Sequence, residues 1–272
     1  IAAPVPIASL TKLMTAVVAA EELPLDQRVF ATAPSFVTSL IPRLSDRSSV
    51  SMYSLLQLLL VESSNEAAEV IASEYGREEF ITAMNAKARQ LGMLNTTFAD
   101  PSGLSAENVS TVRDIMIMSN YLIKEFPEEY KYFAEKEFTW DRTGGDPITQ
   151  GNRNPLLYKN LGADGIKTGY LAVEKYSLAS SVIRNGRRLI AVGSGFENKN
   201  ARSKESKKLL TWGITNFDLI EIAKSKKPID KIDVWLGKKE QVSVCVKNDI
   251  YKTIPKARKR LLKVSINYNG PV

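Results

Sequence analysis

Ser9-Leu10-Thr11-Lys12 is the stretch of this 272-residue chain on which the interpretation of the fold depends. A serine and a lysine three positions apart on a helix lie on one face, about one turn from each other, so an amine stands beside a hydroxyl. The chain contains no histidine, the usual base of serine hydrolases, and lysine is the main alternative. Because a chain of this length contains the SxxK spacing by chance about once, the motif needs partners elsewhere in the sequence.

The overall composition is ordinary for a soluble globular protein. The chain is 44% hydrophobic and 25% charged, and its length allows one large domain or two smaller ones. No apolar run approaches the roughly 20 residues that span a bilayer. Residues 1–8 also lack the basic segment of a secretory signal. We therefore expect neither a membrane-spanning helix nor a signal peptide within these residues.

The composition gives little support to metal or disulfide chemistry. Cys245 is the only cysteine, so no internal disulfide can form, and the absence of histidine argues against a zinc site. A Mg²⁺ or Ca²⁺ site made of carboxylates alone stays open, although no Ca²⁺-loop spacing is present. We expect no metal and no cofactor.

Positive charge is concentrated in the C-terminal part of the chain. The formal net charge is +7, and residues 222–272 contain thirteen Lys or Arg against four Asp or Glu. Such a segment suits an anionic lipid, a nucleic acid or an acidic polymer, but a solvated strand surface is the favoured interpretation. No aromatic residue interleaves the basic run 256–260, so we expect no nucleic-acid partner.

The hydrophobic spacing predicts an α+β protein with a helix-rich body over residues 1–222 and a β-rich domain over 228–272. The expected helices cover 9–22, 51–61, 66–75, 78–91, 112–126 and 201–222, with Thr111 capping the fifth. Strands are expected over 137–140 and 165–168, and loop with short strands over 31–50. Asn185-Gly186 predicts a hairpin that joins 176–184 to 189–196.

Two further motifs follow Ser9-x-x-Lys12 in an order that suits a lysine-assisted serine site. Ser63-x-Asn65 lies where an apolar helix ends, and Lys167-Thr168-Gly169 lies on the strand expected to pair with the hairpin. Each motif alone has a plainer explanation, since serine and asparagine cap helices and a lysine is usually a surface residue. A phosphate loop is excluded because Ile166 stands where that motif requires glycine. The co-occurrence of all three motifs favours the catalytic interpretation.

Through these motifs the chain resembles the penicillin-recognising serine DD-peptidases, the low-molecular-mass penicillin-binding proteins that act on peptidoglycan. The resemblance covers roughly residues 4–221 and extends through the segments 6–16, 84–88, 91–93, 101–104, 164–169 and 206–210. It implies a β-lactamase/DD-peptidase-like body, with an antiparallel sheet between helices and an all-helical part. Residues 228–272 resemble the start of the second domain of the carboxypeptidase branch. Because relatives place strands ahead of SxxK, we expect this chain to be trimmed at both ends.

The resemblance implies five catalytic residues. Ser9 would attack the penultimate D-Ala carbonyl and carry the acyl-enzyme, and Lys12 would take the serine proton. For that role the pKa of Lys12 must fall by about 3 units, through burial and the positive charge of Lys167. Ser63 would relay a proton to the leaving amine, Asn65 would hydrogen-bond the substrate, and Lys167 would organise the polar network around Ser63.

The resemblance also implies four substrate-binding residues. Thr168 would bind the terminal carboxylate together with Arg202, and Gly169 would leave room for a substrate alongside the strand. The backbone N–H groups of Ser9 and Tyr170 would form the oxyanion hole. Two departures from the family pattern are a Ser-Ser-Asn motif in place of Ser-Gly-Asn, and Tyr170 where histidine is frequent.

The leading hypothesis is therefore a serine D-alanyl-D-alanine carboxypeptidase that removes the terminal D-Ala of stem pentapeptides and is covalently inhibited by penicillin. A DD-endopeptidase that cuts D-Ala–diaminopimelate cross-links is the alternative. A β-lactamase is less favoured because the expected distance after Ser63 holds the turn 100–103 and no matching glutamate motif for a second base. A non-catalytic wall-binding module is less favoured because the motifs are complete. The expected partners are peptidoglycan stem peptides and β-lactams, with membrane-surface association through a segment beyond residue 272. The substrate implies an extracytoplasmic location, in the periplasm or on the outer face of the cytoplasmic membrane.

Overall fold

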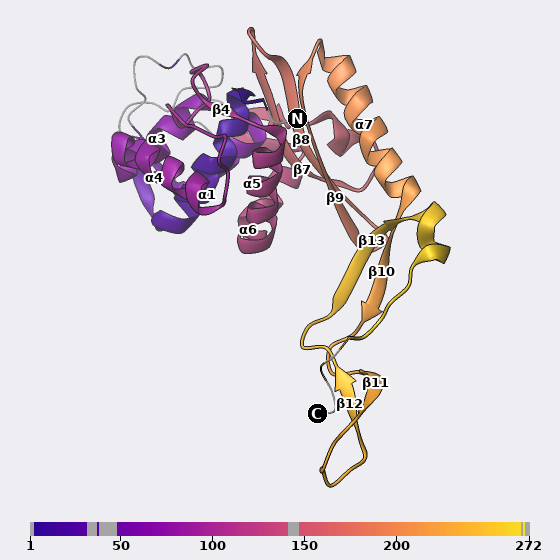
Figure 1. The fold of residues 1–272 in the computed structure, drawn as a ribbon. Helices are drawn as coiled ribbons and strands as arrows, with labels where there is room; N and C mark the ends of the chain where they lie inside the picture. The colour runs from indigo at the N-terminus through magenta and orange to yellow at the C-terminus, as the bar shows by residue number, and fades with distance from the viewer. Residues whose placement is uncertain (1–2, 32–36, 38–47, 141–146, 268, 270–272) are drawn as a thin grey trace. The chain divides into compact units, whose positions relative to one another are not determined.

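The computed structural model describes residues 3–31, 37, 48–140, 147–267 and 269 (Figure 1). The chain divides into two compact units, Ile1–Leu210 and Thr211–Val272, which we describe separately. The first unit combines a helical part with a three-stranded antiparallel sheet, and the described strands of the second form two antiparallel pairs. The predicted α+β class is confirmed.

A buried helix forms the centre of the helical part. Along α1 (Lys12–Glu22) the side chains from Lys12 to Ala19 are all buried. The helix carries Ala, Val, Leu and Met on all its faces, and a helix that is apolar all round packs inside the protein. Burying each large apolar side chain contributes about 1.5–3 kcal/mol. The other main helical elements are η1 (Ala8–Thr11), α2 (Met52–Gln57), η2 (Leu58–Glu62), α3 (Asn65–Tyr75), α4 (Arg77–Gln90) and α5 (Val112–Glu125).

The remaining short elements connect this core to the sheet. They are the one-turn helices α6 (Pro127–Tyr130), η3 (Lys131–Ala134) and η4 (Pro155–Tyr158), and the antiparallel strand pairs β1 (Val5–Pro6) with β4 (Val109–Ser110), β2 (Arg28–Ala31) with β3 (Ser48–Ser51), and β5 (Glu137–Trp140) with β6 (Ile148–Gly151). The loop expected over residues 31–50 lies mostly outside the described residues.

The sheet of the first unit brings two of the sequence motifs together. Its strands are β7 (Ala163–Leu171), β8 (Lys175–Arg184) and β9 (Arg187–Phe196), in the order β7-β8-β9. The hairpin turns at Asn185 and Gly186, both with positive φ (52° and 70°), as predicted. Helix α5 packs against β9, and η1 packs against β7. The SxxK segment therefore lies beside the KTG strand.

The helix expected over residues 201–222 is too long. Helix α7 (Lys199–Asn216) ends at Asn216, and residues 217–222 lie in β10 (Phe217–Ala223), which pairs with β13 (Ile250–Pro255). Residues 217–222 alternate apolar and acidic side chains and include the β-branched Ile220 and Ile222, and pairing with a strand about thirty residues later decides their conformation. The other pair of the second unit is β11 (Pro228–Asp233) with β12 (Gln241–Cys245).

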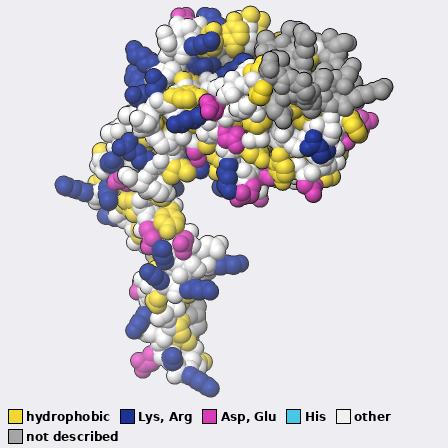
Figure 2. Space-filling model, turned by 180° about the vertical axis from the view of Figure 1, so that it is seen from behind, with side chains coloured by type: hydrophobic (Ala, Val, Ile, Leu, Met, Phe, Trp, Pro, Cys, Tyr) yellow, Lys and Arg dark blue, Asp and Glu magenta, His cyan; other side chains and the backbone are white. Residues whose placement is uncertain are grey.

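The basic residues of the C-terminal unit are dispersed. Figure 2 shows Lys and Arg side chains along this unit, with Asp and Glu between them, and no dense cationic patch on the face that it presents. Most side chains of β11 and β12 are exposed. This arrangement agrees with a solvated strand surface. No described helix has the length and apolar character needed to cross a bilayer.

Candidate active site

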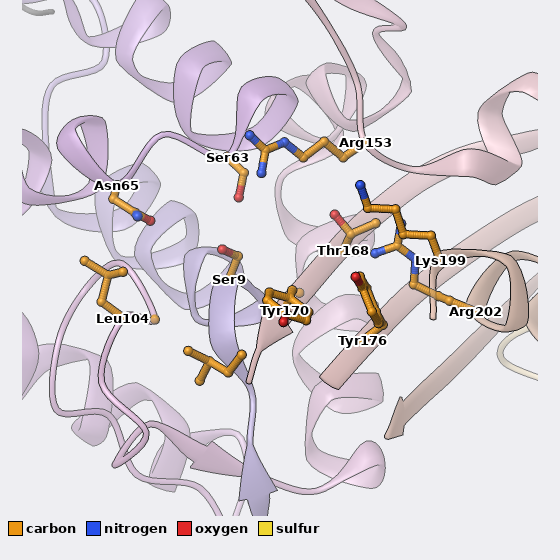
Figure 3. Close-up of a pocket in the computed structure, with 13 residues that line it drawn as sticks. Ser9, Ser63, Asn65, Leu104, Arg153, Thr168, Tyr170, Tyr176, Lys199 and Arg202 are labelled. Carbon is orange, nitrogen blue, oxygen red and sulfur yellow. The ribbon is translucent and has the colours of Figure 1, made fainter. Parts of the chain in front are cut away.

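A cleft of about 810 Å³ in the first unit contains most of the residues that the motifs single out. Seven of the nine predicted site residues line it: Ser9, Ser63, Asn65, Thr168, Gly169, Tyr170 and Arg202 (Figure 3). The other two, Lys12 and Lys167, are 0% and 3% exposed and contact lining residues from beneath. The fold therefore gathers three motifs that are more than fifty residues apart in the chain.

Ser9 and Lys12 face each other at the junction of two helices. Ser9 lies in the 3₁₀ turn η1, in which residues three apart are nearly eclipsed, and Lys12 begins α1. Lys12 Nζ lies 3.1 Å from Ser9 Oγ. Ile7, not Ser9, is the N-cap residue of η1, and Lys12 is fully buried. The interpretation of Ser9 as a helix cap and Lys12 as a surface residue is therefore wrong.

The Lys12 amine is surrounded by three hydrogen-bond partners. Besides Ser9, it donates to Asn65 Oδ1 at 2.7 Å and to the carbonyl oxygen of Ser102. The pKa of Lys12 falls from 10.5 to about 7, mainly because of burial; the positive charge of Arg153 also lowers it, while Asp100 and Glu69 act in the opposite direction. Sequence reasoning anticipated the fall but not the part of Arg153, which no motif contains.

These three partners decide where the lone pair of a neutral Lys12 points. A neutral amine has two N–H donors and one lone pair. Asn65 Oδ1 and the Ser102 carbonyl can only accept, so they take the two N–H groups. The Ser9 hydroxyl can donate, and it alone suits the lone pair. The geometry thus directs the neutral amine to act as a base toward Ser9.

Ser63 is held in a left-handed conformation at the end of a π-helical turn. The element η2 ends at Glu62, and Ser63 follows with φ 65° and ψ 37°. Ser64, not Ser63 or Asn65, caps α3, since its side chain accepts the N–H of Ala67. The hydroxyl of Ser63 instead receives a 2.7 Å hydrogen bond from Lys167 Nζ. Non-glycine residues in this region are strained and concentrate at functional sites.

Lys167 lies on β7 and is as deeply buried as Lys12. Burial lowers the pKa of Lys167 well below its ordinary value, and the positive charges of Lys12, Arg153 and Arg202 lower it further. Besides the bond to Ser63, its amine donates to the Thr168 carbonyl at 3.3 Å. The second lysine therefore connects the strand to the turn that carries Ser63.

Gly169 allows the KTG strand to approach the serine helix closely. A Cβ at this position would lie 2.4 Å from Ser177 Oγ and 3.0 Å from the Ile7 carbonyl oxygen. We predicted that the missing side chain leaves room for a substrate. The structure adds that it leaves room for the backbone immediately before Ser9.

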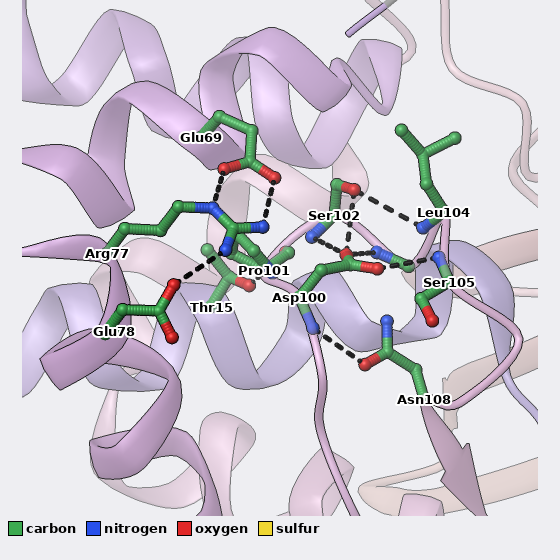
Figure 4. A network of polar contacts seen from close by, with 11 residues as sticks. Thr15, Glu69, Arg77, Glu78, Asp100, Pro101, Ser102, Leu104, Ser105 and Asn108 are labelled. Atoms are coloured by element: carbon green, nitrogen blue, oxygen red, sulfur yellow. Dashed lines mark hydrogen bonds and ion pairs between the residues drawn. The ribbon is translucent and has the colours of Figure 1, made fainter. Parts of the chain in front are cut away.

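The loop after Pro101 completes the surroundings of Lys12 (Figure 4). Asp100 is buried, and Oδ1 of its carboxylate accepts the N–H groups of Ser102 and Gly103 at 2.7 and 2.6 Å. Oδ2 accepts the N–H of Ser105 at 2.7 Å. Gly103 has φ +85°, and a Cβ there would lie 1.9 Å from the Ala8 carbonyl oxygen. The carboxylate thus shapes a turn that presses against the serine segment and aims the Ser102 carbonyl at Lys12.

One end of the cleft is built from aromatic and cationic residues that sequence reasoning largely missed. The guanidinium of Arg202 lies 5.6 Å from the ring centroid of Tyr176, which is 4.6 Å from the ring of Tyr170. Tyr176 belongs to β8 and Lys199 to α7, and both line the cleft with Arg153. Their positions depend on the hairpin and on the start of α7, so no short motif identifies them.

Glu62 is an acidic residue close to the site that takes no part in the hydrogen bonds of the described residues. It is fully buried, and neither carboxylate oxygen has a partner among these residues. Burial raises the pKa of Glu62 to about 7, and the positive charge of Arg153 opposes the rise. In the sequence, the position of Glu62 directly after the apolar run 58–61 was the only sign that this carboxyl is buried. The described residues contain no cluster of His, Cys, Asp or Glu suited to a metal.

Known proteins resemble this chain over nearly its whole length. A family model described as D-alanyl-D-alanine carboxypeptidase matches residues 1–197, and one described as penicillin-binding protein 5, C-terminal domain, matches residues 217–272. The D-alanyl-D-alanine carboxypeptidase DacC of Escherichia coli (strain K12) is 35% identical over 280 residues, which are 97% of this chain and 69% of that protein. The chain spans as little as 54% of other curated relatives.

Two further comparisons bear on the fold and on the reaction. The crystal structure of penicillin binding protein 5 from Haemophilus influenzae superimposes with a TM-score of 0.83 and 32% identity, over 95% of this chain and 78% of that one. A D-alanyl-D-alanine endopeptidase of Escherichia coli (strain K12) is 33% identical over 225 residues, 76% of this chain and 69% of that protein.

Gly103→Ala tests the contact between the loop and the serine segment. We expect a loss of unfolding free energy of about 3 kcal/mol or more, because the added Cβ meets backbone that cannot move independently. Gly92→Ala is the matched control, since Gly92 has φ +75° and nothing within 4 Å of the added atom. It should cost only about 1 kcal/mol, the strain of a left-handed alanine. Equal losses in urea unfolding of the two variants would show that the contact is unimportant.

Glu62→Gln tests the buried carboxyl. With a pKa of about 7 in place of 4.5, Glu62 makes the folded protein bind more protons than the unfolded chain between these values. Its contribution to stability therefore falls as the pH rises from 4.5 to about 7. Glutamine cannot ionise, so the variant should gain about 3 kcal/mol on wild type between about pH 4.5 and pH 8. Denaturant unfolding at both pH values measures this gain. The exposed control Glu240→Gln should show none, and an equal pH dependence in Glu62→Gln and wild type would contradict the prediction.

Proposed function

Because the chain belongs to the D-alanyl-D-alanine carboxypeptidase family of serine peptidases, as its sequence motifs predicted, we propose that it removes the terminal D-Ala of peptidoglycan stem pentapeptides. The observation that carries this proposal is the 3.1 Å contact between Ser9 Oγ and the Nζ of a lysine that burial brings to a pKa of about 7. In a chain without histidine, this pair supplies both nucleophile and base.

In the acylation step, Ser9 Oγ attacks the carbonyl carbon of the penultimate D-Ala while Lys12 takes the hydroxyl proton. Backbone N–H groups of Ser9 and Tyr170 stabilise the oxyanion that forms. As the C–N bond breaks, the proton reaches the leaving amine through Ser63, whose hydroxyl is bonded to Lys167. D-Ala departs with a free amino group, and the remaining peptide stays as an ester on Ser9.

In the deacylation step, water attacks the ester carbonyl and Lys12 accepts its proton. The Ser9–carbonyl bond breaks, and the proton returns to Ser9 Oγ. Asn65 uses its oxygen toward Lys12, which leaves its amide nitrogen to donate to the bound peptide. During acylation, Thr168 and Arg202 hold the terminal carboxylate of the substrate. A buried guanidinium such as that of Arg202 binds a carboxylate through strong, charge-assisted hydrogen bonds.

A DD-endopeptidase activity is the second candidate. The same catalytic steps cut a cross-link when the leaving amine belongs to diaminopimelate, and one relative is a D-alanyl-D-alanine endopeptidase. Chromatography of a digested cross-linked muropeptide dimer distinguishes the two activities: monomers without free D-Ala identify the endopeptidase. Since none of the described residues that line the cleft is an Asp or Glu able to act as a second base, we expect slow turnover of β-lactams rather than a β-lactamase.

The cellular setting follows from the substrate. We place the protein outside the cytoplasm, where peptidoglycan lies, in the periplasm or on the outer face of the cytoplasmic membrane.

Ser9→Ala tests the nucleophile. We expect release of D-Ala from diacetyl-Lys-D-Ala-D-Ala to fall by a factor of at least about 10³, and labelling by fluorescent penicillin to disappear, because no ester can form. Ser243→Ala, which changes an exposed serine of the second unit, should release D-Ala and take up label as wild type does. Undiminished D-Ala release by Ser9→Ala would rule out the proposed function.

The pH dependence of D-Ala release tests the base. Below pH 7 Lys12 is protonated and cannot accept the serine proton, so kcat/KM should rise with pH around a midpoint near 7. Lys12→Arg should lose activity by a factor of about 10²–10⁴ and lose this rise, since a guanidinium stays charged. Lys204→Arg, at an exposed position of α7, should keep the wild-type profile. A flat profile in wild type would exclude Lys12 as the base.

A further inference from the structure

Three cationic side chains line the active-site cleft, two of them at one end. Figure 3 shows Lys199 and Arg202 with Thr168 on one side of Ser9, and the guanidinium of Arg153 turned toward Ser63. Asn65 lies on the opposite side of Ser9 in the same view. Among the described residues that line the cleft there is no Asp or Glu. The cleft thus has one cationic end and one neutral end.

These three cationic side chains form no ion pair within the described part of the chain. None of the ion pairs found there includes Arg153, Lys199 or Arg202. Arg202 is only 7% exposed, and its buried Nε has no hydrogen-bond partner among the described residues. A buried donor of this kind costs free energy until an acceptor reaches it. The cationic end is therefore prepared for an anion that the described residues do not supply.

The effect of Arg153 extends over the whole site. Burial lowers the pKa of Arg202 and the positive charge of Arg153 lowers it further, as it does for Lys12 and Lys167. The positive charge of Arg153 also lowers the pKa of Glu62, but burial outweighs this effect and the pKa is raised to about 7. At neutral pH this carboxyl is only partly ionised, so an excess of positive potential remains over the cleft.

A single terminal carboxylate binds Arg202 and Thr168. The charges of Lys199 and Arg153 are then not neutralised by it. Lys199 lies one helical turn before Arg202 on α7, so both side chains project toward the same end of the cleft. We propose that Lys199, assisted by Arg153, forms a second anion subsite that binds a further carboxylate on the leaving group. This inference rests on the proposed function, because the terminal carboxylate defines which end receives the leaving group.

The subsite selects a chemical class of substrate. Leaving groups with two carboxylates fit it, namely D-amino acids with a carboxylate side chain and peptides joined through a diamino dicarboxylic residue. Lys199 is exposed and carries its ammonium on a flexible four-carbon stem, so it can follow carboxylates at different separations. The reaction is unchanged: the same amide bond breaks, and the dicarboxylate departs as the free amine.

Three acetylated peptides that differ only in the leaving residue test the proposal. They end in D-Ala-D-Ala, D-Ala-D-Glu and D-Ala-D-Gln, and the last two are nearly isosteric but differ by one charge. In wild type we expect kcat/KM for the D-Glu peptide to exceed that for the D-Gln peptide by about fivefold at low salt. This ratio should approach one as salt rises, because the lysine is exposed.

Lys199→Gln should reduce the D-Glu to D-Gln ratio to about one, a change that a general structural defect would not produce. Lys204→Gln removes the same charge from an exposed position of α7 outside the cleft and should keep the wild-type ratio. A wild-type ratio of one, or a ratio that Lys199→Gln leaves unaltered, overturns the subsite. If D-Ala is released normally in that case, the proposed function stands. If no peptide is cleaved, the proposed function and the subsite both fail.

Discussion

A fully buried lysine amine with three hydrogen-bond partners is the constraint on which the active site depends. The partners of Lys12 come from three separate segments: the 3₁₀ turn with Ser9, the start of α3 with Asn65, and the loop after Pro101 with Ser102. An amine removed from water is costly unless its hydrogen bonds are satisfied. Each segment must therefore be in place before the amine can be buried without that cost.

This constraint also explains the chemistry that the site supports. The burial that makes Lys12 costly as an ammonium lowers its pKa to about 7 and so turns it into a base. The nearby Lys167 is affected in the same way, and the charge of Arg153 acts on both. Under the proposed function, a substrate that brings carboxylates into the cleft would offset this mutual repulsion, so one arrangement of charges would supply the base and attract the substrate.

Backbone geometry holds these side chains at their working distances. Ser63 is left-handed at the end of η2, which directs its hydroxyl to Lys167 instead of into a helix cap. Gly103 and Gly169 bring the loop and β7 against the backbone of residues 7 and 8, where any side chain would meet carbonyl oxygens. The serine segment is thus held from two sides by main-chain contacts. Such contacts need glycine, and no other residue could replace it without moving the nucleophile.

The sequence by itself determined the local elements and the chemistry of the nucleophile. Periodicity identified α1 and α5 and the hairpin of β8 and β9, because these patterns depend on neighbours a few residues away. The missing histidine and three short motifs led to Ser9 and Lys12, since the motifs keep their spacing in any context. Tertiary structure decided what depends on distant partners. Residues 217–222 became a strand through pairing with β13, and Arg153, Tyr176 and Lys199 reached the cleft from separate elements. The pKa of Lys12, about 7, also depends on this tertiary structure, because burial and the charge of Arg153 both lower it.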